Sequence, residues 1–443
     1  MNLDYIYLYN KDVYERQYGK EILCKEKLSI NYIQEGIVLP NKPCDGYVFG
    51  KGGVLDAEYK YIPFSGIYTK AGKIDFENEK FQVYFGDGEY PANSKINEIN
   101  EEVIYLGYIF NHWGHFLVDC STRLWYLIDE WDHKKKLCFS VYENSNFKMI
   151  ENIKKFFEYL GVNVEKQIIF INCPTKFKTV IVPEAGYIAN SYYSKQYLKV
   201  FDKVVENIPY KDYGYKKIYF TRQKLVKARM SEFGEDLFEK IYMNNEYKII
   251  APEKCSLEKQ VNLIRSAEDI VCMAGTIAHN MLFAKNNQRI TILNKTYIVN
   301  IVQKDINMMK RLNVTYIDSY ISVFPVGLGQ GPFCIIFNEN FNKYLKDNKF
   351  KLLYDNRYLK RKNIRYIKRY IKRCRQMKVK VEAYNEDKNA TNYFALDNLK
   401  NFYLQYYIDV YPLKLSEKIE AYVKMKICWC DNLKNKIVNK LKR

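Results

Sequence analysis

Three residues suited to acid–base chemistry follow one another at intervals of four: His115, Asp119 and Arg123. On a helix such residues are neighbours, so each side chain would contact the next. A carboxylate beside an imidazole orients the ring and favours its charged form, which suits a general base or a group that positions one. Arg123 would then brace the carboxylate. The same spacing also fits a surface ladder of charged side chains, and spacing alone does not separate the two interpretations.

A second segment ends in residues that suit a phosphate ligand. Residues 217–220 are expected to form a strand, which Thr221, Arg222 and Lys224 follow. Ligands of parallel sheets bind beyond the carboxyl ends of the strands, and arginine is permanently charged, planar and bidentate. We therefore expect these residues to contact a diphosphate. A surface arginine in a strand–helix loop is the alternative.

A third segment combines a strand, a turn and the start of a helix. Residues 270–273 read as the strand, Gly275 and Thr276 as the turn, and His279 and Asn280 fall in the first turn of the helix. Backbone N–H groups at a helix N-terminus bind phosphate oxygens. The alternative is a core helix that contains one hydrogen-bonded histidine.

The order of the expected elements indicates an α/β protein. Residues 1 to about 100 alternate short apolar stretches with turn residues, as strands and hairpins do. Strands and helices then alternate to about residue 206, and one helix, residues 113–131, carries His115. The other elements expected here are strands 103–107, 137–141, 167–171 and 179–183 and helices 147–160 and 192–206.

A stretch with Pro, Gly and Asp, residues 208–214, marks a boundary. Strand–helix–strand units follow it, and their length requires right-handed crossovers and a parallel sheet. We predict an acceptor-side α/β lobe over 1–207, a donor-binding Rossmann-like lobe over 208–340 and a basic helical region over 341–443. The elements expected in the second lobe are strands 217–220, 247–250, 270–273 and 290–293 and helices 232–243, 256–266 and 278–283.

The positive charge of the chain is concentrated near its end. The net charge is +19, and residues 351–380 contain 13 Lys or Arg and one acidic residue. Apolar residues at helical spacing from Ile364 to Cys374 predict an amphipathic helix there, and a second candidate helix lies within residues 415–441. Such a region suits an anionic membrane surface or is a solvated helical face.

The cysteine pattern and the N-terminus bear on location. The chain has 11 Cys at irregular spacing, which fits a reducing compartment rather than a disulfide framework. The first residues lack the apolar stretch of a signal peptide, and no apolar run is long enough to span a bilayer. We expect a cytoplasmic protein whose contact with the plasma membrane, if it has one, is peripheral.

The three segments together resemble glycosyltransferase family 61. Members carry His-Trp-Leu-Leu-Asp followed by Arg-Leu, which resembles residues 115–119 and 123–124 of this chain. They also carry a strand that ends in Ser/Thr-Arg, similar to residues 219–222. A strand, a Gly-rich turn and an Asn-x-x-Phe helix start are similar to residues 271–283. The motifs occur in the same order, and the resemblance covers about residues 100–300.

The resemblance implies a GT-B fold, in which two Rossmann-like lobes face each other across a cleft. It implies an inverting transfer of a sugar from a nucleotide sugar to a glycan or lipid-linked acceptor in surface polysaccharide synthesis. His115 or Asp119 would be the base, and Arg222, Lys224 and the segment from Gly275 to Asn280 would contact the diphosphate. Many members have Pro-His-Gly-Ala-Gly in the turn, whereas this chain has a histidine only later, at His279.

We expect neither a metal nor a cofactor. Asp129 and Asp132 are spaced wrongly for the Asp-x-Asp motif that binds a metal–diphosphate, and no His/Cys cluster has ligand spacing. Three other functions compete with the transfer of a sugar. A polysaccharide pyruvyl transferase would have similar lobes, a non-catalytic assembly protein would have the fold alone, and a nucleic-acid-binding protein would use the basic helix. The last lacks any zinc-finger, RNP or helix-turn-helix signature.

Overall fold

The computed structural model describes residues 3–9, 21–70, 81–90, 92, 95–296, 300–321 and 331–384. The chain forms two compact units. The first comprises Met1–Lys224, Ile241–Leu293 and Val299–Ile317, and the second comprises Leu225–Lys240, Asn294–Ile298 and Asp318–Arg443. The α/β class expected from the sequence is confirmed. The lobe boundaries at 207/208 and 340/341 and the GT-B arrangement stay predictions.

The first unit contains a nine-stranded mixed sheet in the order β10-β9-β8-β11-β4-β5-β7-β6, with β3 paired to β11. Strands β10, β9, β8 and β11 run parallel, and β4 joins β11 antiparallel. The strands are β3 (Ile30–Gln34), β4 (Ile37–Lys42), β5 (Gly50–Leu55), β6 (Ile67–Thr69), β7 (Gln82–Asp87), β8 (Asn97–Tyr108), β9 (Lys136–Ser140), β10 (Ile168–Ile171) and β11 (Thr175–Pro183). A separate small sheet pairs β12 (Tyr187–Ile188), β13 (Tyr192–Ser194) and β2 (Leu23–Lys25).

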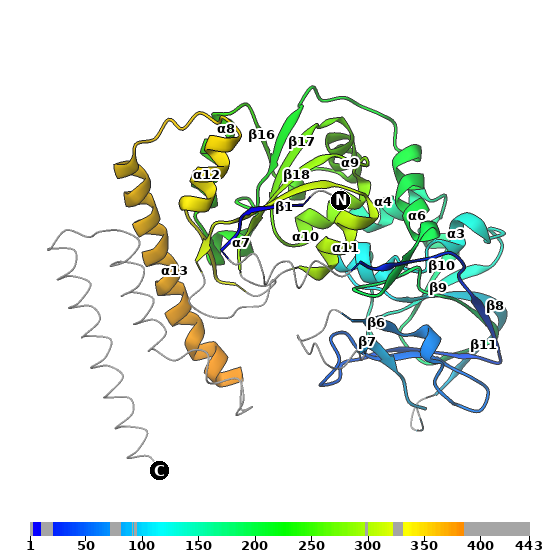
Figure 1. The fold of residues 1–443 in the computed structure, drawn as a ribbon. Helices are drawn as coiled ribbons and strands as arrows, with labels where there is room; N and C mark the ends of the chain where they lie inside the picture. Colours follow the sequence, from blue (N-terminus) through cyan, green and yellow to red (C-terminus); the bar gives the residue numbers. More distant parts are fainter. Residues whose placement is uncertain are drawn as a thin grey trace, which may run out of the picture. The chain divides into compact units, whose positions relative to one another are not determined.

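A six-stranded sheet has the order β1-β19-β18-β17-β14-β16 (Figure 1). Its strands are β1 (Leu3–Tyr7), β14 (Lys217–Phe220), β16 (Lys248–Ile250), β17 (Asp269–Met273), β18 (Arg289–Asn294) and β19 (Asn313–Asp318). The chain runs outward from β14 to β16 and then returns to β17 on the other side of β14, and these pairs are parallel. In such sheets ligands bind beyond the carboxyl ends of the strands at this switch point.

Helices cover the sheets, and the longer ones α4, α6 and α9 do so with a mainly apolar face. In the first unit they are α2 (Trp113–His115), α3 (Tyr126–Asp129), α4 (Glu151–Tyr159), α5 (Val164–Gln167), α6 (Lys195–Asn207), α9 (Leu257–Ser266), α10 (Thr276–His279) and α11 (Ile301–Met309). Single turns of other helix types are η1 (Pro63–Ser65), η2 (Phe116–Cys120), η3 (Pro252–Lys254) and η4 (Asn280–Phe283). Figure 1 shows α9, α10 and α11 beside the strands of the six-stranded sheet.

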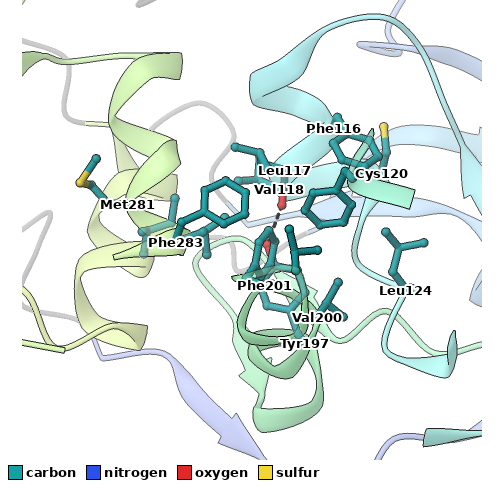
Figure 2. Close-up of a cluster of buried hydrophobic side chains, with 14 of the residues drawn as sticks. Phe116, Leu117, Val118, Cys120, Leu124, Tyr197, Val200, Phe201, Met281 and Phe283 are labelled. Atoms are coloured by element: carbon teal, nitrogen blue, oxygen red, sulfur yellow. Dashed lines mark hydrogen bonds between the residues drawn. The ribbon is translucent and has the colours of Figure 1, made fainter. Parts of the chain in front are cut away.

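Aromatic rings form the part of the core that joins the helices of the two sheets (Figure 2). Phe201 of α6 lies with its ring centroid 5.8 Å from that of Phe156 and 5.7 Å from that of Phe283. Phe116 of η2 contacts Phe156 edge-on at 5.1 Å. The buried hydroxyl of Tyr197 donates a hydrogen bond of 2.8 Å to the carbonyl oxygen of Leu117. Because these side chains come from η2, α4, α6 and η4, packing holds these elements in one arrangement.

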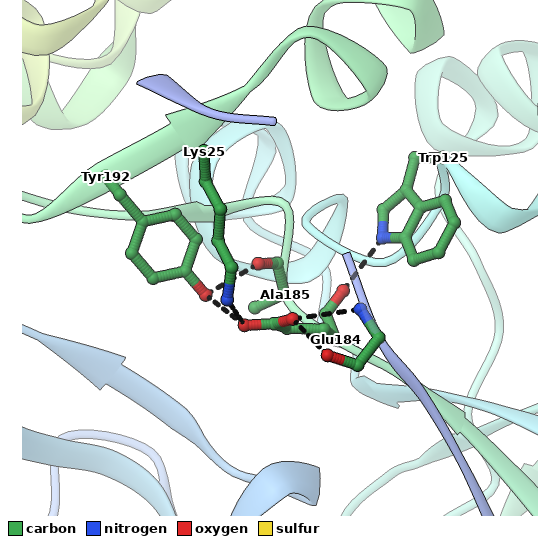
Figure 3. Close-up of polar contacts among 6 residues, drawn as sticks. Lys25, Trp125, Glu184, Ala185 and Tyr192 are labelled. Carbon is green, nitrogen blue, oxygen red and sulfur yellow. Dashed lines mark hydrogen bonds and ion pairs between the residues drawn. The ribbon is translucent and has the colours of Figure 1, made fainter. Parts of the chain in front are cut away.

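A buried carboxylate attaches the N-terminal segment to the same region (Figure 3). Glu184 is paired with Lys25, and it accepts hydrogen bonds of 3.0 Å from both the backbone N–H and the hydroxyl of Ser29. Its backbone carbonyl accepts a hydrogen bond of 2.8 Å from the indole N–H of Trp125. Burial raises the pKa of Glu184, but the contacts from Lys25 and Ser29 outweigh it and leave the pKa below its ordinary value. The carboxylate therefore stays charged, and these contacts tie residues 25–29 to the segment that follows η2.

The second unit has a small sheet of β15 (Glu232–Phe233), β21 (Phe333–Ile335) and β20 (Tyr320–Ile321). Helix α13 (Asn356–Tyr384) packs against this sheet with Leu359, Tyr366, Ile367 and Tyr370 buried. The amide of Asn363 exchanges hydrogen bonds with the backbone of Phe337, at 3.1 and 2.6 Å. The helices α7 (Val226–Ser231), α8 (Glu235–Met243) and α12 (Glu339–Asp347) complete the description. The second predicted basic helix, within residues 415–441, lies outside the described residues.

The predicted helices 192–206 and 232–243 begin later than expected, because residues 192–194 and 232–233 form β13 and β15. The predicted helix 113–131 is wrong in detail. In place of a continuous helix over residues 113–131, the chain forms one α-helical turn, the π-helical turn η2, a run of turns and then α3. The widening at η2 is marked by a hydrogen bond of 3.0 Å from the N–H of Ser121 to the carbonyl oxygen of Phe116, five residues back. Buried side chains on all sides of Phe116, Leu117 and Val118 explain why packing overrides the regular helix here.

Candidate active site

The short helix α2 begins with a histidine cap. The ring of His112 accepts a hydrogen bond of 3.4 Å from the backbone N–H of His115, which is the role that Ser or Asp usually has at this position. One turn later, Nδ1 of His115 lies 2.7 Å from the carboxylate of Asp119. The predicted imidazole–carboxylate pair therefore exists, and the π-helical turn keeps the two side chains in contact.

Aromatic rings surround His115 on several sides. Its ring centroid lies 5.1 Å from that of Phe49, 5.5 Å from that of Phe110 and 4.6 Å from that of His112. The His115 side chain is 38% exposed, whereas that of Asp119 is 12% exposed. Because Nδ1 contacts the carboxylate, the other ring nitrogen, Nε2, is the one left for a substrate.

A small cavity adjoins Asp119. It has a volume of about 10 Å³, enough for one water molecule. Tyr68, Tyr187 and Ala189 are among the residues that line it. Burial raises the pKa of Tyr84, and the negative charge of Asp119 raises it further. Asp119 therefore lies in a partly enclosed region of neutral phenols.

The Gly–Thr turn packs directly against α2. Gly275 has a φ of 131°, which residues with a side chain rarely adopt, and it lets the chain turn from β17 into α10. A Cβ atom on Gly114 would lie 2.7 Å from Thr276 Cγ2 and 2.8 Å from its Oγ1, so only glycine fits there. The indole N–H of Trp113 donates a hydrogen bond of 2.7 Å to the amide oxygen of Asn280. Two of the three predicted segments are thus in contact.

The third segment lies at the same edge of the sheet. Phe220 of β14 pairs with Cys272 of β17, so the chain leaves the two strands at neighbouring positions, about 4.8 Å apart. Thr221 is buried, and its hydroxyl accepts a hydrogen bond of 3.0 Å from the N–H of Gln223. This hydrogen bond shapes the turn. Arg222 is half-buried and Lys224 is exposed.

His279 and Asn280 are more buried than a surface phosphate site requires. Asn280 is 3% exposed, and its amide also donates 3.3 Å to Gln260. His279 is 8% exposed, with Nδ1 2.9 Å from the amide oxygen of Gln303. Burial lowers the pKa of His279 to about 4, and the charges of His115 and His112 act in the same direction. His279 is therefore neutral at physiological pH.

Arg123 lies elsewhere than we predicted. It is 1% exposed, and its guanidinium donates to the carbonyl oxygens of Pro183, Phe64 and Gly66 at 2.9, 2.8 and 2.8 Å. The π-helical turn ends at Cys120 and residues 121–125 form turns, so Arg123 is not held on the same helical face as Asp119. Arg123 therefore positions the strand ends beside the Asp119 cavity and does not brace Asp119 or reach a substrate.

Sequence reasoning missed several residues that complete this region. His112, Trp113 and Gln260 lie close to the predicted motifs, but Gln303 is in α11, and spacing along the chain gives no signal for it. Among the described residues, no three His, Cys, Asp or Glu side chains are grouped so as to hold a metal ion. The metal-independent reaction stays a prediction.

The family comparison covers the three predicted segments of this arrangement. Residues 113–291, from α2 into β18, match the family model described as Glycosyltransferase 61. This part of the chain is similar to glycosyltransferase family 61. No curated protein matches the chain. The matched residues contain the imidazole–carboxylate pair, the Arg222 segment and the Gly275 turn.

The Gly114–Thr276 contact gives a testable prediction. Gly114→Ala places a methyl group against Thr276, and overpacking of this kind costs about 1–3 kcal/mol of stability. We expect a lower melting temperature and transferase activity reduced at least about tenfold, since α2 must shift from α10. Thr276→Ser removes the nearest carbon, so the double variant should recover part of both losses.

Gly161→Ala is the matched control, because no atom lies near its added Cβ although its positive φ also strains an alanine. It should lose stability and keep activity. Equal activity of Gly114→Ala and wild type would contradict the close packing of the two segments.

Proposed function

We propose that the chain is an inverting, metal-independent glycosyltransferase that uses a nucleotide sugar, with His115 as its base. The observation that carries this proposal is the position of one helical turn. α2 carries His115, whose Nδ1 lies 2.7 Å from Asp119, and the neighbouring Gly114 packs directly against Thr276 at the carboxyl edge of the parallel sheet. An acceptor hydroxyl and a phosphorylated donor would meet at such a position.

The reaction would be a single displacement. Nε2 of His115 takes the proton of the acceptor hydroxyl as its oxygen attacks the anomeric carbon, and the bond from that carbon to the diphosphate breaks. The electron pair leaves with the nucleoside diphosphate. Asp119 accepts the Nδ1–H of His115 and stabilises the imidazolium that forms, and its lower exposure suits this supporting role better than that of the base.

The departing diphosphate would be stabilised by Arg222, assisted by Lys224, and by backbone N–H groups of the Gly275 turn. The first N–H groups of a helix have no partner within it, so they are available to oxygen ligands. α10 is a single turn, and a single turn aligns few peptide dipoles. The guanidinium would therefore carry more of the charge stabilisation than the helix.

The wider context is also part of the proposal. We infer a GT-B organisation, a glycan or lipid-linked acceptor in surface polysaccharide synthesis, and a cytoplasmic site of action. The six-stranded sheet, in which β14 pairs parallel with β16 and β17, supports a Rossmann-like donor lobe. The cysteines that the structure describes are free thiols, which fits a reducing compartment.

The basic face of α13 supports contact with an anionic membrane. Arg357, Arg361, Arg365, Lys368 and Lys372 are exposed at intervals of three or four residues, opposite the buried apolar face. No helix among the described residues has the length and apolarity needed to cross a bilayer. Each Lys or Arg near an anionic surface contributes about 1 kcal/mol, so this face would hold the enzyme beside a lipid-linked acceptor.

A transfer assay tests the chemistry. A thermal-shift screen of UDP-, GDP- and CMP-sugars and phosphoenolpyruvate first identifies the donor, and stabilisation by phosphoenolpyruvate alone would favour a pyruvyl transferase. We then expect His115→Ala and Asp119→Asn to lower kcat about 10²- to 10⁴-fold, because the base or its tautomer is lost. Arg222→Ala should lower kcat about 10²-fold through loss of leaving-group stabilisation.

Two matched variants control for that assay. His133→Asn removes an exposed histidine at a positive φ that asparagine tolerates, and Arg289→Ala removes an exposed arginine at the opposite, amino-terminal end of β18. Both should keep near-normal kcat. Near-normal kcat in the three site variants as well would refute the proposed site.

Vesicle flotation of the full chain tests the membrane contact. We expect binding to vesicles that contain phosphatidylglycerol, little binding to neutral phosphatidylcholine vesicles, and release by salt because the attraction is screened. Changing Arg361, Arg365, Lys368 and Lys372 to Gln should abolish flotation. The same change at the exposed Lys134, Lys148, Lys195 and Lys211 should not. Equal loss in both sets would rule out a specific role for α13.

A further inference from the structure

Helix α11 carries the most unusual set of buried polar side chains in the first unit. Gln303, Lys304, Asp305 and Asn307 are each at most 1% exposed, and buried polar side chains are costly unless they are hydrogen-bonded. Asp305 accepts a hydrogen bond of 2.9 Å from the hydroxyl of Tyr187, and Tyr187 lines the cavity beside Asp119. Gln303 lies 2.9 Å from His279. One helix thus supports residues on two sides of the candidate site, and it lies beyond the residues matched by the family model.

Gln303 belongs to a chain of hydrogen bonds that ends at the hydroxyl of Tyr316. Its amide nitrogen donates 2.9 Å to the side-chain oxygen of Asn307, and the amide nitrogen of Asn307 donates 2.6 Å to the hydroxyl of Tyr316. In this arrangement Gln303 presents its oxygen to His279. An amide oxygen only accepts, so with this amide orientation Nδ1 of His279 carries the proton.

This orientation determines the other ring nitrogen. With the proton on Nδ1, Nε2 of a neutral His279 has a lone pair and no hydrogen. No other hydrogen-bond partner of His279 occurs within the part of the chain that the structure describes. The groups that act on its charge are His115 and His112 near α2 and the neutral Gln303 on α11, and burial is the largest effect. Burial, His115 and His112 lower the pKa of His279 and so keep its ring uncharged, whereas the contact with Gln303 raises this pKa.

We propose that Gln303 is a positioning residue that holds His279 as the Nδ1–H tautomer, so that Nε2 accepts a hydrogen bond from a hydroxyl group of a bound sugar. The proposal rests on the proposed transfer function. It also changes the role expected for His279, because a nitrogen that has a lone pair and no hydrogen repels a phosphate oxygen rather than binding it. His279 therefore recognises sugar, and the diphosphate belongs to Arg222 and the Gly275 turn.

Ring-nitrogen NMR tests the tautomer without any activity. The chain has four histidines, so full-length protein labelled with ¹⁵N-histidine gives few signals, and a His279→Asn variant identifies the one of interest. We expect His279 to be in the Nδ1–H form from pH 6 to 8. Gln303→Met removes the acceptor and should shift the signal toward the Nε2–H form. A wild-type Nε2–H or charged ring, or an unchanged signal in Gln303→Met, would overturn the proposal.

The pH profile of Gln303→Glu tests the consequence for transfer. A carboxylate beside Nδ1 keeps that hydrogen bond but favours the charged ring, which raises the pKa of His279 and puts a proton on Nε2. The variant should therefore approach wild-type kcat/KM at high pH. Below the raised pKa, the variant-to-wild-type ratio should fall up to about tenfold per pH unit. Wild type should show no such loss, since the pKa of His279 is about 4.

Gln288→Glu is the matched control. Gln288 is also buried and bonded to backbone carbonyls, at 2.7 Å to both Ile264 and Ala267, but it lies near the turn that precedes β18. Its ratio to wild type should not change with pH even if its melting temperature falls. A pH-independent ratio for Gln303→Glu, with the ring shown by NMR to be charged, would also overturn the proposal. Absence of transfer from any donor would refute the proposed function instead, while the NMR result would still decide the role of Gln303.

Discussion

The arrangement depends on the close approach of Gly114 to Thr276. A glycine with no Cβ lets α2 lie against the turn that follows β17, and the hydrogen bond from Trp113 to Asn280 holds the two together. The ring core of Phe116, Phe156, Phe201 and Phe283 fills the space behind this contact. As a result, packing sets the distance between two parts of the candidate site. One is the His115–Asp119 pair, and the other is the candidate phosphate-binding turn at Gly275 and Thr276.

The two histidines of this region differ in their surroundings and so in their chemistry. His115 is partly exposed, and its ring contacts the carboxylate of Asp119. His279 is buried beside a neutral amide and resists protonation. A base, His115, and a neutral hydrogen-bond acceptor, His279, can therefore lie near each other without repulsion. The side-chain amides of Gln303 and Asn307 on α11 contact His279 as a chain.

Local signals predicted the regular elements well. Strand β14 lies at the predicted residues 217–220, and α9, which Ser256 caps, lies within the predicted helix 256–266. These features depend on neighbouring residues alone. The π-helical turn and the burial of Arg123 depend on packing against distant strands, so the even spacing of His115, Asp119 and Arg123 was misleading for the third. Gln303 is 24 residues from His279, and only the fold shows that the two are in contact.

The most direct test is a structure of the chain with a nucleoside diphosphate bound. We predict that the terminal phosphate contacts Arg222 and the N–H groups of the turn at Gly275 and Thr276, with His115 Nε2 facing the space where the sugar would be attached. A nucleotide bound away from the carboxyl ends of β14 and β17, or with His115 turned from its phosphates, would contradict the account.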